Sequence, residues 1–117
     1  MSSGNRTRRV CVITGSSTGI GAATARHFAR HGHDVVINYS RSQDAADAVA
    51  RDCRAAGAQV LVHRADVSDD AQCQALAQAV RARWGRAHAL VNNAGASAGV
   101  VDPKNLDALS AADFQAI

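Results

Sequence analysis

Short apolar runs alternate along this chain with longer segments in which apolar residues recur every three or four positions. A short apolar run is typical of a buried strand, and a period of three to four residues is typical of an amphipathic helix. The short runs predict strands at 10–13, 34–39, 59–63 and 87–91. The periodic segments predict helices at 20–31, from Ser42 to Gly57 and from Ser68 to Gly85.

The predicted helices have recognisable start and stop signals. Ser42 and Ser68 stand where a side chain can cap a first turn, and glycines follow the helical segments at positions 32, 57 and 85. Two helices carry apolar stripes, at Ala46, Val49, Ala50 and Cys53, and at Cys73, Leu76, Ala77, Val80 and Trp84. We interpret both stripes as faces that pack into the core.

The order of these elements predicts the fold class. Apolar strands that alternate with helices pair in parallel through right-handed crossovers. We therefore predict an α/β fold, a doubly wound parallel sheet with helices on both faces.

Beyond the fourth predicted strand the pattern changes. Residues 95–109 are predicted as a loop, and Ser110 with Asp113 predicts the start of a further helix. The sequence ends about two turns into that helix, so the pattern predicts a fold truncated after strand four. We expect a flexible arm over residues 1–8 and assign 9–117 to the N-terminal part of a single domain.

Composition and charge argue against several classes of protein. The net charge is +3, but the 13 basic residues are scattered and lack the interleaved aromatic residues of a nucleic-acid-binding surface. There is no run of 18 apolar residues, and the first seven residues lack the apolar core of a signal peptide, so neither a membrane span nor a signal peptide is predicted. No nucleic-acid or membrane partner is expected.

The three cysteines are spaced unlike a zinc site or a redox motif. Without a secretory signal they predict free thiols in a reducing cytoplasm. His27 and His31 lie one helical turn apart, but no cysteine or acid completes a ligand set on that face. No metal site is predicted.

The segment that joins the first strand to the first helix reads TGSSTGIG, residues 14–21. Gly15 permits a tight turn, Gly19 lets the backbone approach a phosphate, and Gly21 lets the helix pack closely. The helix N-terminus presents N–H groups and a positive dipole end to an anion. This arrangement predicts a dinucleotide phosphate site, and an ordinary glycine-rich turn is the alternative. The hydroxyl donors of the turn are Ser16, Ser17 and Thr18.

Two further motifs make the interpretation specific. Asp66-Val67 follows the third predicted strand, and NNAG at 92–95 follows the fourth. With TGSSTGIG, these motifs resemble the short-chain dehydrogenase/reductase family in order and placement, from about residue 9 to 117. The nearest resemblance is to 3-oxoacyl-acyl-carrier-protein reductases and glucose dehydrogenases. It implies an NAD(P)-binding Rossmann fold and hydride transfer between a carbonyl and an alcohol.

The resemblance also implies how a dinucleotide would be held. The Asp66 carboxylate would accept from the adenine amino group beside Val67, and the segment from Asn93 would pass the adenosine ribose. Capping of a helix by Asp66 and a simple strand-end turn at Asn93 are the alternatives. The cofactor contacts implied are Gly15, Ser16, Ser17, Thr18, Gly19, Ile20, Gly21, Tyr39, Arg41, Ser42, Asp66, Val67, Asn93, Ala94 and Gly95.

The end of the second predicted strand favours NADP(H) over NAD(H). Folds that prefer NAD place a carboxylate there to bind the ribose 2′-hydroxyl, whereas this chain has no acid before Asp44. Arg41 stands in that region, and its planar guanidinium suits a 2′-phosphate. A solvated Arg41 is the alternative. Thr18 departs from many NADP-dependent relatives, which carry a basic residue at that point.

The family's catalytic Tyr-x-x-x-Lys pair is absent from this sequence. The one tyrosine is Tyr39, and the one lysine is Lys104, far along the chain. We therefore predict a short-chain oxidoreductase by family, of which this chain carries the cofactor-binding half, and we predict no catalytic residues and no activity for the chain alone. The complete enzyme is expected to be a cytoplasmic homo-oligomer acting on a small carbonyl or alcohol substrate. The alternatives are a non-catalytic dinucleotide-binding module and a structural remnant without activity.

Overall fold

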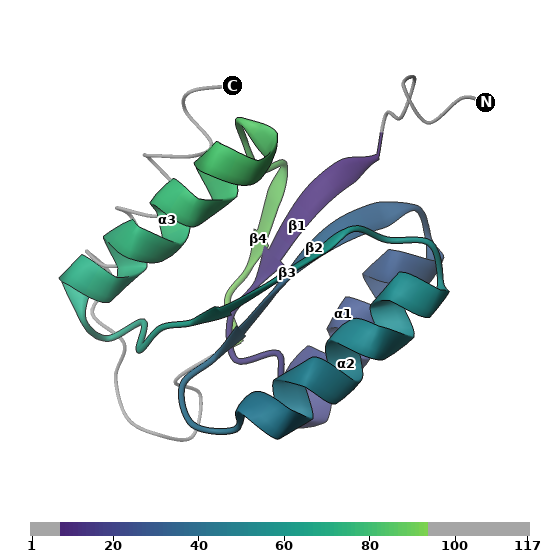
Figure 1. The fold of residues 1–117 in the computed structure, drawn as a ribbon, viewed down its shortest axis with the longest axis horizontal. Coiled ribbons are helices and arrows are strands. Elements are labelled where there is room, and N and C mark those ends of the chain that lie inside the picture. The colour runs from purple at the N-terminus through teal and green to yellow at the C-terminus, as the bar shows by residue number, and fades with distance from the viewer. Residues whose placement is uncertain (1–7, 94–117) are drawn as a thin grey trace.

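The computed structural model describes residues 8–93, in which helices cover both faces of a parallel sheet (Figure 1). The doubly wound α/β fold predicted from the sequence is confirmed for these residues. Residues 1–7 and 94–117, including the predicted loop at 95–109 and the helix start at Ser110, lie outside the described part. The elements are β1 (Arg9–Ile13), α1 (Gly19–Arg30), β2 (His33–Tyr39), α2 (Gln43–Ala55), β3 (Val60–Arg64), α3 (Asp70–Trp84) and β4 (Ala89–Val91).

The strands lie in the order β3-β2-β1-β4, and every pair is parallel. Ile13 at the end of β1 is in register with Ile37 in β2 and Val91 in β4. The chain therefore leaves all four strands at one edge of the sheet. The order also reverses beside β1, and in open α/β sheets ligands bind at the carboxyl edge where this reversal occurs.

Two apolar layers hold the helices on the sheet. Helices α1 and α2 cover one face of the sheet and α3 covers the other (Figure 1). On the first face Ile13 and Ile37 belong to the apolar layer, and on the second Val12 and Val36 pack with Leu76. Both β1 and β2 are buried on both faces, which explains why their sequences are nearly continuous apolar runs. The small side chains of α1 that meet the sheet are Ala22, Ala25 and Ala29.

The start of α3 differs from the prediction. Asp69, not Ser68, caps this helix, because the Asp69 carboxylate accepts from the backbone N–H of Ala71 at 3.1 Å. The Ser68 hydroxyl instead donates to the Asp66 carboxylate at 2.6 Å. Two adjacent residues were both chemically able to cap, and the turn after β3 decided between them. Ser42 occupies the N-cap position of α2, as predicted, but its side chain makes no capping hydrogen bond.

The fourth strand is shorter than predicted because a histidine side chain enters the ladder. The backbone N–H of Val10 donates to Nδ1 of His88 at 3.0 Å, while the backbone N–H of His88 donates to the Val10 carbonyl at 2.8 Å. Regular pairing with β1 begins only at Ala89. To accept a hydrogen bond at Nδ1, the imidazole must be neutral and carry its proton on Nε2.

This contact predicts a loss of stability at acid pH. Partial desolvation of the imidazole, followed by the charges of Arg86, Arg9 and His33, lowers the pKa of His88 below its usual 6.5. Since the unfolded chain then binds more protons, the stabilisation is present above about pH 6.5 and is lost as the pH falls through the folded-state pKa. His88 is exposed, so we expect an effect of only about 2 °C on Tm between pH 7.5 and pH 5.

The test compares thermal unfolding of the wild type with His88→Asn across that pH range. Asparagine keeps a side-chain acceptor but does not titrate. Burial also lowers the pKa of His63, and this background is shared by both proteins. Equal slopes of Tm against pH in the two proteins would contradict the assignment to His88.

Arg8, the last residue of the predicted arm, ties three elements together at the opposite edge of the sheet. Its Nε donates to the buried Asp34 carboxylate at 2.9 Å, and its Nη2 donates to the carbonyls of His33 at 2.6 Å and Ala29 at 3.2 Å. Asp34 also accepts from the backbone N–H of Gln59 at 2.9 Å. The residue before β1 therefore fastens the end of α1 and the start of β2.

The cysteines are buried and unpaired. Burial raises the pKa of the Cys11 thiol to about 12 and that of Cys73 to about 11, and it also raises the pKa of Cys53. Such thiols are poor nucleophiles and poor metal ligands at neutral pH. Within residues 8–93 the structure contains no helix that is both long and apolar enough to cross a bilayer.

Candidate functional site

The turn between β1 and α1 lies at the carboxyl edge of the sheet, where the strand order reverses. Gly15 and Gly19 have φ angles of 62° and 60°, in the left-handed region that favours glycine. Nothing stands within 4 Å of the place where a Gly19 side chain would begin. The two glycines thus have different roles. Gly15 turns the chain as it leaves β1, and Gly19, which has no side chain, leaves the N-terminus of α1 accessible.

Asn38 in β2 holds the first half of this turn. Its side-chain oxygen accepts from the Gly15 N–H at 3.0 Å, and its side-chain nitrogen donates to the Ala65 carbonyl at 3.1 Å. Its backbone exchanges two hydrogen bonds with Ser16, one to the Ser16 hydroxyl and one from the Ser16 N–H, both at 2.9 Å. Only 2% of Asn38 is exposed, so this amide joins the turn, β2 and the end of β3 inside the protein.

The start of the turn, at Thr14 and Gly15, is also braced by β4 and by the segment that follows it. The Thr14 N–H donates to the Val91 carbonyl at 3.0 Å, and the Thr14 hydroxyl accepts from the Asn93 N–H at 2.9 Å. The Asn93 side chain donates to the Gly15 carbonyl at 3.0 Å. The segment that leaves β4 therefore fixes the turn from the side opposite Asn38.

Gly21 lets the first turn of α1 pack directly against Gly15, Ser16 and Asn93. A Cβ atom at Gly21 would lie 2.3 Å from the Gly15 carbonyl oxygen, 2.7 Å from Nδ2 of Asn93 and 2.9 Å from Cα of Ser16. The sequence predicts that Gly21 lets the helix pack closely. The structure shows that the close approach is to the turn itself and to Asn93.

The outer surface of the turn is open and carries no negative charge. Thr18, Gly19 and Ile20 are exposed, and Ile20, at 78%, is the one large apolar side chain of residues 8–93 that is exposed to this degree. The Thr18 side chain makes no capping hydrogen bond, and the first turn of α1 contains no acid. The first N–H groups of a helix have no intrahelical partners, so they can receive an anion here.

The serines of the turn have different environments. Ser16 is buried and its hydroxyl donates to the Ile13 carbonyl at 2.7 Å, so that proton is used within the fold. Ser17 is half-buried and Thr18 is exposed. The hydroxyls of Ser17 and Thr18 are therefore the ones at the surface of the turn.

The segment after β3 places a carboxylate at the same edge. Asp66 is exposed and accepts from both the hydroxyl and the backbone N–H of Ser68, at 2.6 and 3.0 Å. These two hydrogen bonds, with a smaller contribution from the charge of Arg41, lower the pKa of Asp66. The carboxylate is thus ionised and fixed in direction, while the neighbouring Val67 is buried.

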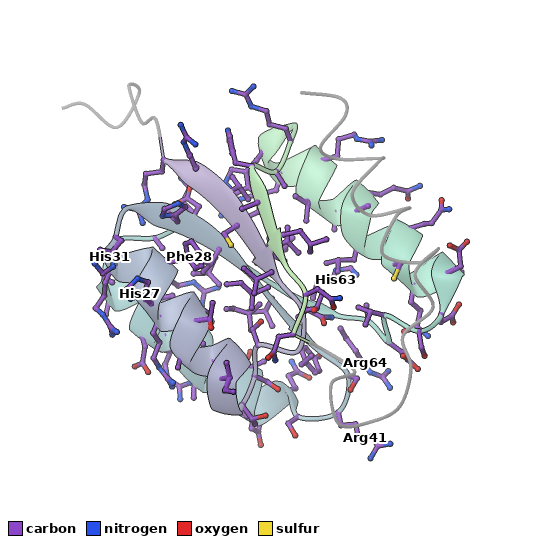
Figure 2. All side chains as sticks on the ribbon, turned by 180° about the vertical axis from the view of Figure 1, so that it is seen from behind. His27, Phe28, His31, Arg41, His63 and Arg64 are labelled. Carbon is purple, nitrogen blue, oxygen red and sulfur yellow. The ribbon has the colours of Figure 1, made fainter. Side chains whose placement is uncertain are left out.

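The end of β2 presents one buried and several exposed residues. Tyr39 is only 8% exposed and belongs to the core beneath α1 and α2, so its ring contributes to packing. Arg41 and Ser42 are exposed. Figure 2 shows Arg41 at the corner of the molecule remote from His27 and His31, which lie near the other end of α1.

The structure therefore brings the predicted residues of the turn, Arg41, Asp66 and Asn93 to one edge of the sheet. Ala94 and Gly95 lie outside the described residues. The sequence interpretation missed Asn38 as a site residue. Asparagine is uncommon inside apolar strands, so Asn38, which directly follows Val35-Val36-Ile37, was the available signal of a buried polar network.

Comparison with known proteins assigns these features to one family. A family model for short chain dehydrogenases matches residues 9–117. An uncharacterized oxidoreductase of Methylorubrum extorquens is 45% identical over 87 residues, covering 74% of this chain and 35% of that protein. A 3-oxoacyl-acyl-carrier-protein reductase of Synechocystis is 39% identical over 89 residues, covering 76% of this chain and 36% of that protein. The chain thus spans about a third of the length of these two relatives.

Solved structures agree with this assignment. The fold superposes on a protein assigned to the short-chain dehydrogenase/reductases from Burkholderia xenovorans with a TM-score of 0.78 and 36% identity, covering 93% of this chain and 52% of that one. A dehydrogenase from Burkholderia cenocepacia with bound NADP gives a TM-score of 0.70 and 31% identity, covering 74% of this chain and 34% of that one.

Proposed function

This chain belongs to the short-chain dehydrogenase/reductase family, and on that basis we propose that its site binds NADP(H) for hydride transfer between a carbonyl and an alcohol. The observation that carries the proposal is the open, acid-free start of α1, held by Asn38 and Asn93 at the carboxyl edge of the sheet. This geometry suits a pyrophosphate, which requires N–H donors and a positive helix end.

Each part of the dinucleotide would have its own residues. The first-turn amides of α1 with Ser17 and Thr18 would hold the pyrophosphate, and Ile20 would lie against the bound molecule. The Asp66 carboxylate, ionised and aimed by Ser68, would accept from the adenine amino group beside Val67. When bound, the cofactor supplies the nicotinamide carbon that gives or takes a hydride.

The preference for NADP(H) over NAD(H) rests on charge at the end of β2. Arg41 is exposed there, and the first acid of the segment, Asp44, is already in the first turn of α2. A guanidinium can bind a 2′-phosphate through two parallel hydrogen bonds, whereas a ribose 2′-hydroxyl calls for a carboxylate.

We further propose that the chain carries the cofactor-binding half of the enzyme and has no activity by itself. Its single tyrosine is buried in the core, and no Tyr-x-x-x-Lys pair occurs in the sequence. That absence is also what supports the second candidate, a dinucleotide-binding module without catalysis. For the complete enzyme we propose a small carbonyl or alcohol substrate, a homo-oligomeric state and a cytoplasmic location.

Calorimetric titration of the purified chain with NADPH and NADH tests the proposal. We expect NADPH to bind the more tightly, and Arg41→Ala to weaken NADPH binding by about 10- to 100-fold, because hydrogen bonds to charged groups contribute about 1.5–3 kcal/mol. NADH binding should change less than about twofold, since NADH lacks the 2′-phosphate.

Arg51→Ala is the matched control, because Arg51 is an exposed arginine two turns into α2. It removes the same charge and should leave both affinities unchanged. Absence of binding to either dinucleotide would overturn the proposal. Equal affinity for both would overturn the preference for NADP(H) alone.

A further inference from the structure

A second arginine lies beside the end of β2, although it is distant from Arg41 in sequence. Arg64 is the last residue of β3 and is in register with Tyr39, the last residue of β2. The next backbone N–H, that of Ala65, donates to the Tyr39 carbonyl at 2.9 Å. Parallel pairing therefore fixes the Arg64 backbone next to the segment that begins at Ser40.

The Arg64 side chain turns toward that segment. Its Nε donates to the Ser40 carbonyl at 3.2 Å, and the residue is exposed. Within residues 8–93 the structure gives its two terminal nitrogens, Nη1 and Nη2, no hydrogen-bond partner. Figure 2 shows Arg64 and Arg41 at the same corner of the molecule, and the contact with Ser40 places Arg64 next to the residue that precedes Arg41.

The charge of a 2′-phosphate favours a site with more than one arginine. A phosphate monoester carries about −1.5 to −2 charges at pH 7. The positive charge of Arg41 is partly offset by Asp66, whose carboxyl is close enough for Arg41 to lower its pKa. Arg64 adds a second guanidinium group beside Ser40, the residue that precedes Arg41.

We propose that Arg64 is a second specificity-determining residue of this site, which binds the 2′-phosphate of NADP(H) together with Arg41. The proposal rests on the proposed function and adds to it a residue from β3. The bond from Nε to Ser40 holds one side of the planar guanidinium, so the two terminal nitrogens are directed before any ligand arrives. A guanidinium held in this way loses less rotational freedom on binding than a solvated side chain does.

The experiment measures the dissociation constants of NADPH and NADH for the 117-residue chain and for Arg64→Gln, Arg64→Lys and Arg51→Gln. We expect Arg64→Gln to weaken NADPH binding about 10-fold, as removal of one charge-assisted contact does. NADH binding should change less than twofold. Arg64→Lys keeps the charge but loses the Nε contact, so it should fall between the wild type and Arg64→Gln. Arg51→Gln should match the wild type.

The outcomes separate this inference from the proposal on which it rests. A wild type that prefers NADPH, together with an unchanged preference in Arg64→Gln, would overturn the role of Arg64 and leave the proposed function intact. Equal losses for NADPH and NADH in Arg64→Gln would also overturn it, because a merely structural role affects both. A wild type that binds neither dinucleotide would overturn both proposals. Circular dichroism verifies folding, and Arg64→Lys provides the test if the glutamine variant does not fold.

Discussion

Gly21→Ala is expected to destabilise this protein by about 3 kcal/mol and to lower its Tm by about 10 °C, at the upper end of what overpacking costs. The new methyl group would stand 2.3 Å from the Gly15 carbonyl oxygen and 2.7 Å from Nδ2 of Asn93, and neither atom is the end of a long flexible side chain. The turn or α1 must therefore move. Since that turn is the proposed pyrophosphate site, NADPH affinity should fall by about 100-fold, or about 2.7 kcal/mol. Thermal unfolding and calorimetric titration measure the two effects.

Gly57→Ala is the control for this substitution. Gly57 has a φ of 100°, but nothing lies within 4 Å of the position of its Cβ, and it follows α2 at the other edge of the sheet. Alanine there pays only for a left-handed backbone, about 1–2 kcal/mol, and should not alter dinucleotide binding. If Gly21→Ala destabilised the protein no more than Gly57→Ala does, close packing of α1 against the turn would not require a glycine at position 21.

Asn38→Leu is expected to cost about 3 kcal/mol, because leucine fills a similar volume but leaves two buried backbone groups unpaired at about 1–3 kcal/mol each. The two groups are the N–H of Gly15 and the carbonyl of Ala65. The turn would lose its anchor on β2, so NADPH affinity should fall together with stability. Denaturant unfolding and NADPH titration of the variant give both quantities.

Asn38→Asp refines this test. The carboxylate retains an acceptor for Gly15 but faces the Ala65 carbonyl without a donor, so it should be at least as damaging as leucine at pH 7. Gln59→Leu replaces an exposed amide side chain with the same apolar residue and should change stability by less than about 0.5 kcal/mol. A stable Asn38→Leu variant with normal NADPH binding would show that the amide is dispensable.

Most of the fold could be predicted because it depends on patterns local to each element. The apolar run around Ile13 and the stripe that includes Leu76 each indicated their own element and the face it buries. The first and last residues of the elements could not be predicted as well, because side chains distant in sequence decide them. The imidazole of His88 interrupts the ladder with Val10, and Asp66 draws Ser68 away from the cap of α3.

The parts of the candidate site that depend on local sequence could also be predicted. The glycine spacing indicated the turn, and the family resemblance indicated Asp66 and Asn93, which each follow a predicted strand. What could not be predicted was which polar groups the fold itself uses. The sequence predicts that the Ser16 hydroxyl donates to a phosphate, but in the structure it donates to the backbone carbonyl of Ile13. The sequence does not indicate a role for Arg64, because Ser40, which its side chain contacts, is distant in sequence.

The sequence by itself determined the succession of strands and helices, the glycine turn and the family. Those features follow from side-chain period and backbone freedom within a few residues, which a sequence displays directly. Only the tertiary structure decided that Asn38 and Asn93 hold the turn, that Gly21 must lack a side chain, and that Arg64 reaches Ser40. Each of these facts depends on a hydrogen bond or a contact across strands, and buried polar groups take the partners that the parallel sheet brings beside them.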